Sequence, residues 1–215
     1  MPAKPSTDPA STLGMARAER ADFLDFLRTL PAEQWEAPTL CGDWRVREVV
    51  AHVISYDELT LGGVAAQFAR GRFSLDRSNA LRLTDYRALS PAELLDAFER
   101  HVQPRGLTAS FGGMVALLDG LIHHQDIRRA LGLPREIPAD RLLRALRLSR
   151  LAPPIGAWWR SRGLRLVAED VHWSVGSGAE VRGKGEALLM ATAGRLVPAA
   201  ELTGPGAPVL LARRG

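Results

Sequence analysis

The sequence predicts a mainly α protein, in which a four-helix bundle is followed by a small α+β domain. Amphipathic patterns near the helical period recur four times within about the first 135 residues, joined by short and medium loops, as is typical of a bundle. After Pro138 the pattern changes to one more helix and then to short β-rich runs separated by turn residues. We predict a flexible tail over residues 1–10, a helical domain over 11–152 and an α+β domain over 153–215.

The first two helices follow a tail that is unsuited to regular structure. Residues 1–10 contain three prolines together with Ser, Thr and Asp, a composition typical of a flexible terminus. Apolar residues recur near the helical period over 13–30, and Pro31 stops that pattern. The second helix is predicted over about 46–68, with Asp43 as its N-cap because a carboxylate there accepts hydrogen bonds from free backbone N–H groups.

The third helix has the clearest start in the chain. Residues 90–93 read Ser-Pro-Ala-Glu, which combines an N-cap serine, proline at the first helical position and the glutamate of a capping box. We predict that this helix runs to about residue 103 and that the fourth covers 112–131, closed by Gly132. The stretch 71–83 between the second and third helices is predicted to be irregular.

Shorter elements are predicted after the bundle. A further amphipathic helix covers 139–152, and β-rich runs follow at 164–170 and 171–176. Residues 185–194 indicate a helix, and 207–214 are interpreted as a last strand. This mixture is the basis for the predicted α+β domain.

Composition and length are those of a globular protein, because the 215 residues are 46% hydrophobic and 24% charged. The best candidate for a membrane span, residues 114–122, is interrupted by Asp119 and falls short of the roughly 18 residues that a span needs. The N-terminus lacks the apolar core of a signal peptide, and the single cysteine, Cys41, cannot form an internal disulfide. We therefore expect a soluble, cytoplasmic protein with no membrane partner.

The charge pattern argues against a nucleic-acid partner. Lys and Arg total 28 against 24 Asp and Glu, a net charge of +4. The basic residues are spread along the chain, many of them beside acids, whereas a nucleic-acid interface gathers them on one face or in one arm. Nucleic-acid binding stays an alternative, and it predicts an affinity that falls steeply with salt.

Common catalytic motifs are absent from the sequence. It contains no glycine-rich dinucleotide motif, phosphate-binding loop, GxSxG elbow or HExxH motif. Cys41 precedes a predicted helix, where a thiol can be activated, but no histidine lies near it in the sequence to act as a base. We keep Cys41 as a reserve nucleophile, with a small apolar core residue as the alternative.

Histidines and a carboxylate on two predicted helices suggest a metal site. His52 lies in the middle of the second helix, and Asp119 and His123 are four residues apart on the fourth, hence on one face. Helical bundles build metal sites from such side chains, and three protein ligands leave positions open for water or substrate. The alternative is a chance pair beside a core histidine with a hydrogen-bond partner. We expect Asp126 to form a surface ion pair with Arg128 or Arg129.

Three segments carry a family resemblance. They are LCGDWRVREVVAHV, DGLIHHQDIRRALG and VAEDVHWSVG with the later VRGKGEALLMATAGR. In combination they resemble the DinB/YfiT-like metalloenzyme superfamily, and more closely the mycothiol-dependent maleylpyruvate isomerase family. The similarity covers nearly everything after the N-terminal tail, and the last segment resembles that family's small C-terminal domain.

The resemblance implies a DinB-like bundle that holds a divalent metal, usually zinc, with nickel, iron or manganese as alternatives. It assigns His52, Asp119 and His123 as ligands, although the family often has Glu where this chain has Asp119. It also implies mycothiol or a similar thiol as cosubstrate and makes Arg195 the residue that pairs with a carboxylate of the thiol or the substrate. We expect a monomer or a homodimer.

Two functions are consistent with these residues. A metal-bound thiol ionises at neutral pH, so the protein would be a thiol-dependent isomerase or S-transferase acting on a small electrophile. The alternative is a non-catalytic metal- or ligand-binding stress protein of the DinB/YfiT-like superfamily. A site for binding and a site for catalysis share the same ligands, so the sequence does not separate the two, nor does it identify the substrate.

Overall fold

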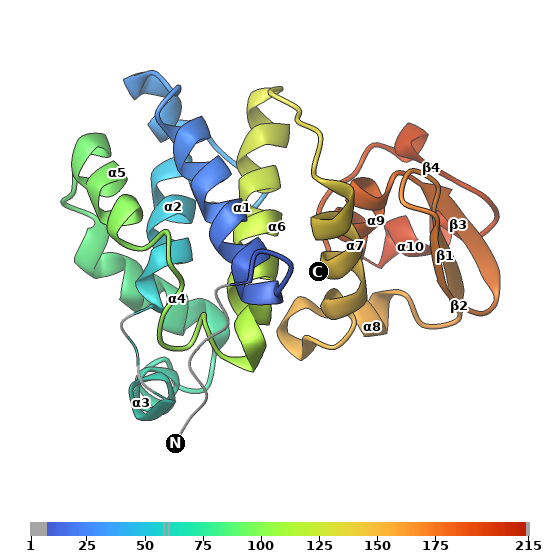
Figure 1. The fold of residues 1–215 in the computed structure, drawn as a ribbon. Helices are drawn as coiled ribbons and strands as arrows, with labels where there is room; N and C mark the ends of the chain where they lie inside the picture. Colours follow the sequence, from blue (N-terminus) through green and yellow to red (C-terminus); the bar gives the residue numbers. More distant parts are fainter. Residues whose placement is uncertain (1–7, 58, 60, 214–215) are drawn as a thin grey trace. The chain divides into compact units, whose positions relative to one another are not determined.

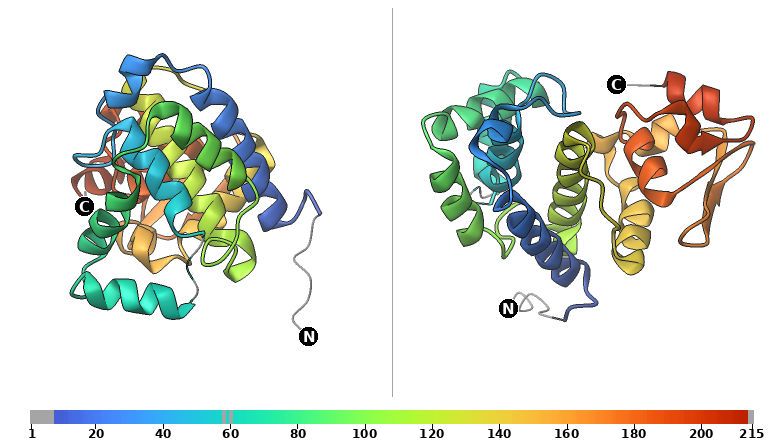
Figure 2. Two further views of the ribbon diagram at one scale, coloured as in Figure 1. Left: turned by 90° about the vertical axis from the view of Figure 1, so that its left-hand side faces the viewer. Right: turned by 90° about the horizontal axis from the view of Figure 1, so that it is seen from above.

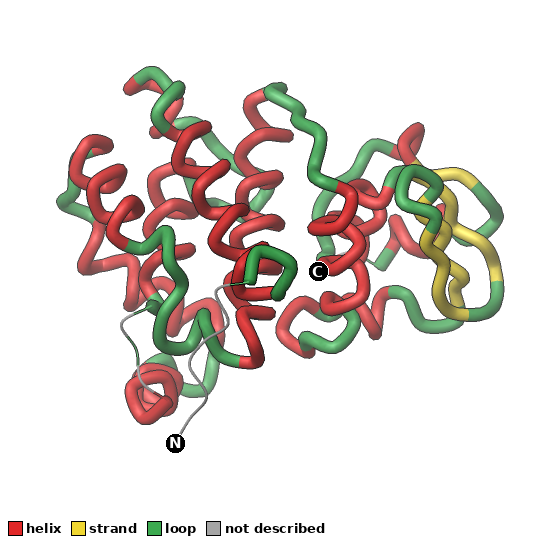
Figure 3. Tube along the Cα trace, in the orientation of Figure 1, coloured by secondary structure: helices red, strands yellow, loops and turns green. Residues whose placement is uncertain are grey.

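The structure, a computed structural model, describes residues 8–57, 59 and 61–213. It is mainly helical, and by contacts the chain divides after Leu133 into two compact units (Figure 1). All described strands belong to the second unit (Figure 3). Most of the tail predicted over residues 1–10 lies outside the described residues. No helix in the described part of the chain is long and apolar enough to cross a bilayer.

The first unit consists of helices joined by loops and short 3-10 turns. The α-helices are α1 (Thr12–Leu27), α2 (Val46–Ser55), α3 (Leu61–Arg70), α4 (Leu75–Leu83), α5 (Pro91–Arg100) and α6 (Met114–Leu131). The 3-10 helices are Ala32–Glu36, Thr84–Tyr86 and Phe111–Gly113. Helix α1 packs against α5 and α6, and α2 packs against α4, α5 and α6 (Figure 2).

An apolar core holds these helices together. Phe23 of α1 and Phe98 of α5 meet edge to face with ring centroids 5.3 Å apart, and both side chains are fully buried. Helix α2 adds a nearly continuous aliphatic run, because Val49, Val50, Val53 and Ile54 all belong to the same cluster. The core therefore fixes α2 between the helices that flank it.

A buried ion pair ties α1 to the end of α2. The Arg20 guanidinium donates to both oxygens of Asp57, at 2.6 and 3.0 Å, and both side chains are fully buried. Thr108 also donates to Asp57, and Arg20 donates to the carbonyl of Val53 at 3.0 Å. These bonds compensate the desolvation of the two charges, so removing either partner would leave a buried charge unpaired.

Several predictions for this unit are confirmed, and others are wrong. The helix predicted from Ser90 is α5: Ser90 Oγ accepts from the Glu93 N–H at 3.3 Å, and the Glu93 carboxylate accepts from the Ser90 N–H at 2.7 Å. The prediction that residues 71–83 are irregular is wrong, because most of them form α4. Asp43 is not the cap of α2; that cap is Arg45.

The second helix is shorter than predicted, because long-range contacts end it. Helix α2 stops at Ser55, and α3 is a separate helix. The Ser55 carbonyl accepts a hydrogen bond from Arg82 at 2.6 Å, and Asp57 is engaged by Arg20. Neither contact leaves a sign in the local pattern of apolar residues.

The second unit places helices against a small sheet. Its helices are α7 (Ala139–Ser149), α8 (Ala157–Arg160), α9 (Gly185–Thr192) and α10 (Ala207–Ala212), and its strands are β1 (Leu164–Ala168), β2 (Trp173–Gly176), β3 (Ala179–Gly183) and β4 (Leu202–Thr203). The strand order is β2-β1-β3-β4, with β1 and β3 parallel and the other pairs antiparallel. Helix α9 contacts β1, β3, α7, α8 and α10.

Two features of this unit differ from the sequence predictions. The boundary follows Leu133 rather than residue 152, because α7 packs on α9: a Cβ on Gly185 would lie 3.1 Å from both Leu142 and Leu146. The last strand predicted at 207–214 is wrong, because residues 207–212 form α10 with proline in its first turn. The strands β1 and β2 and the helix α9 are confirmed.

Candidate metal centre

Three side chains predicted as ligands meet in the first unit. One carboxylate oxygen, Asp119 Oδ1 of α6, lies 3.2 Å from His52 Nε2 of α2 and 3.4 Å from His123 Nε2 of α6. The two imidazole rings are nearly perpendicular, with centroids 4.9 Å apart. One ligand atom from each residue lies within 4.8 Å of the other two, so the three could bind a single ion.

The helices explain this convergence. Asp119 and His123 are one turn apart on α6, and α2 packs directly against α6 with His52 near its middle. The side chain of His123 is 8% exposed and that of His52 is 11% exposed, whereas Asp119 is 24% exposed. The cluster is therefore mostly shielded from water, with its carboxylate on the more accessible side.

A buried carboxylate orients His123. Asp126 Oδ2 lies 2.9 Å from His123 Nδ1, and Asp126 is fully buried. This bond places a proton on Nδ1, so Nε2, which points toward Asp119, is the ring nitrogen that remains for a metal once it is deprotonated. The surface position expected for Asp126 is therefore wrong. Arg128 instead donates to His124 Nε2 at 2.8 Å.

A loop before α2 supplies an aromatic wall. The Trp44 ring lies 4.9 Å from the His52 ring and 6.4 Å from the His123 ring, measured between centroids. Thr39 closes this loop, because its N–H and hydroxyl both donate to the Trp44 carbonyl. Tyr56 meets the His52 ring edge to face at 5.8 Å. These rings restrict water around the cluster and strengthen electrostatic interactions inside it.

The charges of the cluster are strongly coupled. Burial by itself raises the pKa of the Asp119 carboxyl, but electrostatic attraction and hydrogen bonds from the two neighbouring imidazoles outweigh it and hold that pKa well below its usual range. Burial lowers the pKa of His123, whereas the charge of Asp119 and the hydrogen bonds around the ring raise it well above its usual value. An anionic carboxylate thus faces a cationic imidazole.

A second group of candidate ligands shares His123. Cys41, Asp126 and His123 also offer atoms within 4.8 Å of one another, and the Cys41 side chain hydrogen-bonds His123. We favour the group around Asp119, because His123 Nδ1 already bonds Asp126 whereas its Nε2 faces the other ligands. The contact of Cys41 with a histidine was missed, because the two are distant in the sequence and only folding brings them together.

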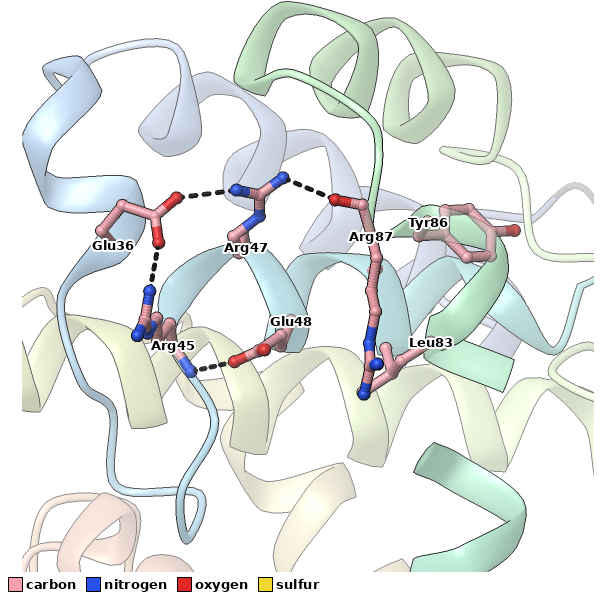
Figure 4. A pocket seen from close by; sticks show the side chains of 8 residues that line it. Glu36, Arg45, Arg47, Glu48, Leu83, Tyr86 and Arg87 are labelled. Atoms are coloured by element: carbon pink, nitrogen blue, oxygen red, sulfur yellow. Dashed lines mark hydrogen bonds and ion pairs between the residues drawn. The ribbon is translucent and has the colours of Figure 1, made fainter. Parts of the chain in front are cut away.

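A surface pocket elsewhere on α2 contains none of these ligands. Its volume is about 230 Å³, and its lining includes Glu36, Arg45 and Arg47. Glu36 accepts from Arg45 at 2.7 Å and from Arg47 at 2.8 Å, so the charges compensate one another (Figure 4). The charged side chains that line this open pocket pair with one another. We therefore place the functional site at the histidine cluster instead.

Arg195, the remaining predicted site residue, belongs to the second unit. It follows Gly194 after the end of α9, is half-buried, and donates from Nη1 to the Ala193 carbonyl at 3.1 Å.

Comparison with known sequences finds a family match within the first unit. Residues 16–109 match the sequence model of the mycothiol maleylpyruvate isomerase N-terminal domain. Over these residues, which are less than half of the chain, the protein is similar to that domain. The matched segment contains His52, whereas Asp119 and His123 lie beyond its end. Among curated protein sequences, none matches this chain significantly.

Solved structures share the fold of nearly the whole chain. A mutant of the mycothiol-dependent maleylpyruvate isomerase superposes with a TM-score of 0.59 at 17% identity, and the isomerase itself with 0.55 at 16% identity. In each case the match covers 91% of this chain and 92% of the other. At this identity the likeness establishes the fold, a mainly helical chain with a small C-terminal sheet.

Proposed function

We propose that this protein is a metal-dependent enzyme that uses a low-molecular-weight thiol, mycothiol or a similar one, to isomerise or conjugate a small electrophile. The observation that carries the proposal is Asp119 Oδ1 between two imidazole nitrogens, at 3.2 and 3.4 Å, in a chain whose residues 16–109 match the N-terminal domain of this isomerase family. We further propose that α1, α2, α5 and α6 form the DinB-like four-helix bundle around this site.

The residues present fit a divalent metal. Two imidazole nitrogens and one carboxylate oxygen suit zinc, nickel, iron and manganese, and we take zinc first. His52, Asp119 and His123 would hold the ion and leave positions open. A divalent metal bound there would lower the pKa of a coordinated thiol, so that the thiol would be a thiolate at neutral pH.

Other residues of the chain orient and shield the site. Asp126 keeps the proton of His123 on Nδ1, so that Nε2 stays a ligand atom. Trp44 and Tyr56 keep water away from the two histidines. Arg195 is proposed to bind a carboxylate of the substrate or of the thiol, because a guanidinium offers two parallel N–H donors.

The reaction follows from thiolate addition to a conjugated double bond. The sulfur forms a bond to the β-carbon, and the π electron pair moves onto the conjugated carbonyl oxygen. Rotation about the new single bond is then possible. Return of the electron pair re-forms the double bond, expels the thiolate and gives the isomer. Protonation of the α-carbon instead gives a stable thioether conjugate.

Metal content is the test of this proposal. We would measure it by elemental mass spectrometry on untagged protein, beside His52→Ala, His123→Ala and the control His172→Asn. His172 lies outside the cluster at a positive φ of 47°, which asparagine tolerates. We expect near-stoichiometric divalent metal in the native chain and the control, and its loss in both alanine variants.

Activity then separates catalysis from binding. Consumption of electrophiles that depends on an added thiol, and is lost in His52→Ala, supports the enzyme. Retention of both metal and thiol-dependent activity in His52→Ala would falsify the site. Tight metal or thiol binding without turnover would identify the non-catalytic binding protein instead.

A further inference from the structure

The guanidinium of Arg160, at the end of α8, is anchored by one of its nitrogens. Nη1 donates to the carbonyls of Ile155, at 2.7 Å, and Thr192, at 3.4 Å, and so links the segment before α8 to the last turn of α9. Its Nε and Nη2 groups make no hydrogen bond or ion pair with any residue that the structure describes. One nitrogen is thus fixed by carbonyls, and the opposite edge still offers donors.

The backbone leaves a place for this guanidinium. A Cβ on Gly156 would lie 2.4 Å from Arg160 Nη1, and a Cβ on Gly194 would lie 2.9 Å from both Cζ and Nη2. Real contacts are not that short, so any larger residue at either glycine would displace the side chain. The Arg160 guanidinium therefore occupies space that is open only because both turns contain glycine.

More positive charge gathers beside Arg160. Arg195 directly follows Gly194, and burial and then the charge of Arg195 lower the pKa of Arg160. Arg213 donates from Nη1 to the carbonyls of Arg160, at 2.9 Å, and Arg162, at 2.6 Å. Within the described residues no carboxylate pairs with Arg160. The charge of Arg160 is therefore not balanced by an acid of the described residues, and nearby positive charge favours the approach of an anion.

We propose that Arg160 is a second binding residue of the Arg195 site and that the two guanidiniums clamp one carboxylate group of a small organic ligand. Arg160 supplies the paired Nε and Nη2 donors that match a carboxylate in plane, and Arg195 supplies the second cation. The inference rests on the proposed role of Arg195 and adds the residue that would give the site its directionality. Lysine at position 160 could not reproduce this paired geometry.

The test follows succinate binding to the full-length wild-type protein by NMR of the arginine Nε–H groups, with neutral succinamide as the matched control. Arg160→Lys and Arg195→Lys assign the signals. We expect the Arg160 and Arg195 signals to shift with one common Kd, while the signal of exposed Arg162 stays still. Arg160→Met should raise Kd about tenfold, and Arg162→Met, which removes the same charge nearby, by less than about twofold.

Each other outcome overturns the inference. A stationary Arg160 signal while that of Arg195 moves, or equal shifts with succinamide, would show that Arg160 does not bind the carboxylate. In both cases the proposed function stands. If neither arginine responds, the role of Arg195 fails as well, whereas the metal centre is tested separately by the histidine variants. Because the shifts are read in the wild-type chain, the result does not depend on a variant that folds.

Discussion

His123 has a distinct task for each of its ring nitrogens. Nδ1 bonds the fully buried Asp126 at 2.9 Å, and Nε2 faces Asp119 at 3.4 Å. An imidazole held by a carboxylate in this way is a stronger and better-aimed ligand than a free one. The buried acid therefore belongs to the site although it is not among the three proposed ligands.

Replacement of Asp126 by asparagine should weaken metal binding without removing it. The amide keeps the size of the side chain but not its negative charge, so His123 becomes less basic and less firmly oriented. We expect affinity to fall by about 10- to 100-fold, measured by competition with a chromophoric chelator. Asp25→Asn, at an exposed position of α1, is the matched control and should leave affinity unchanged. Equal affinities for both variants would contradict the role of Asp126.

Metal uptake should release a proton. The pKa of His123 is raised well above its usual value by Asp119 and the bonds around the ring, so the metal-free chain is protonated there at neutral pH. A ligand must be deprotonated, and affinity should therefore rise with pH across the neutral range until the raised pKa is passed. Calorimetry in two buffers of different ionisation enthalpy counts the protons released. Heats that do not depend on the buffer would show that His123 is neutral before binding.

Sequence spacing indicated how His52, Asp119 and His123 could meet, and folding brings them together. Whether they hold a metal stays a prediction. Asp126 was assigned to the surface because Arg128 and Arg129 lie close to it in the sequence. Its burial depends on how α6 packs, which the sequence alone does not show. The same reason hid the contact between Cys41 and His123.

At the level of elements, α6 depends on a close approach to α1. Gly113, just before α6, has a φ of +90°, and a Cβ there would lie 2.6 Å from Leu13 Cα. Gly112 also has a positive φ, +68°, but nothing lies within 4 Å of its Cβ position. A side chain at Gly112 would therefore cause backbone strain alone, whereas one at Gly113 would also overlap with another helix.

Alanine substitutions at these glycines should differ in cost. Gly112→Ala introduces strain alone and should reduce the free energy of unfolding by about 1–2 kcal/mol. Gly113→Ala adds a clash with backbone that cannot move independently of α1, so its loss should be clearly larger. Urea denaturation of both variants measures the difference. Equal losses of unfolding free energy in the two variants would contradict this prediction, because they would mean that the start of α1 moves to accommodate the added methyl group.

Elements marked by local chemistry were predictable, and those set by distant contacts were not. The start of α5 is predictable from four consecutive residues, because Ser90 and Glu93 form its capping box. The end of α2 depends on Arg82, which donates to the Ser55 carbonyl from another helix. A run as short as 207–212 carries too little periodicity to separate strand from helix.

For the whole molecule, the division into units follows side-chain packing rather than the change in local pattern. The transition from long helices to short strands falls after α7, which explains why the sequence suggested a boundary at residue 152. Helix α7 nevertheless packs on α9 and belongs with the sheet. Amphipathicity reveals that a helix has a buried face but not which partner covers it.

The metal ion and the carboxylate compound proposed to bind this protein should stabilise different units. Because all three proposed metal ligands lie in the first unit and both proposed clamp arginines in the second, zinc should slow amide hydrogen exchange in α2 and α6. Succinate should slow it around Arg160 and Gly194. Hydrogen exchange read by mass spectrometry resolves these regions, and a chelator should reverse the first effect only. Protection by zinc confined to the second unit would contradict the assignment of the metal centre.

The sheet order has a consequence for self-association. Both outer strands are short: β2 has four residues and β4 has two, whereas the longer β1 and β3 lie between them. Few unpaired backbone N–H and C=O groups are therefore presented along either margin, which gives another chain little to extend by strand addition. If the protein forms a homodimer, its subunits should meet through helical surfaces or loops, and the sheet itself offers little template for ordered aggregation.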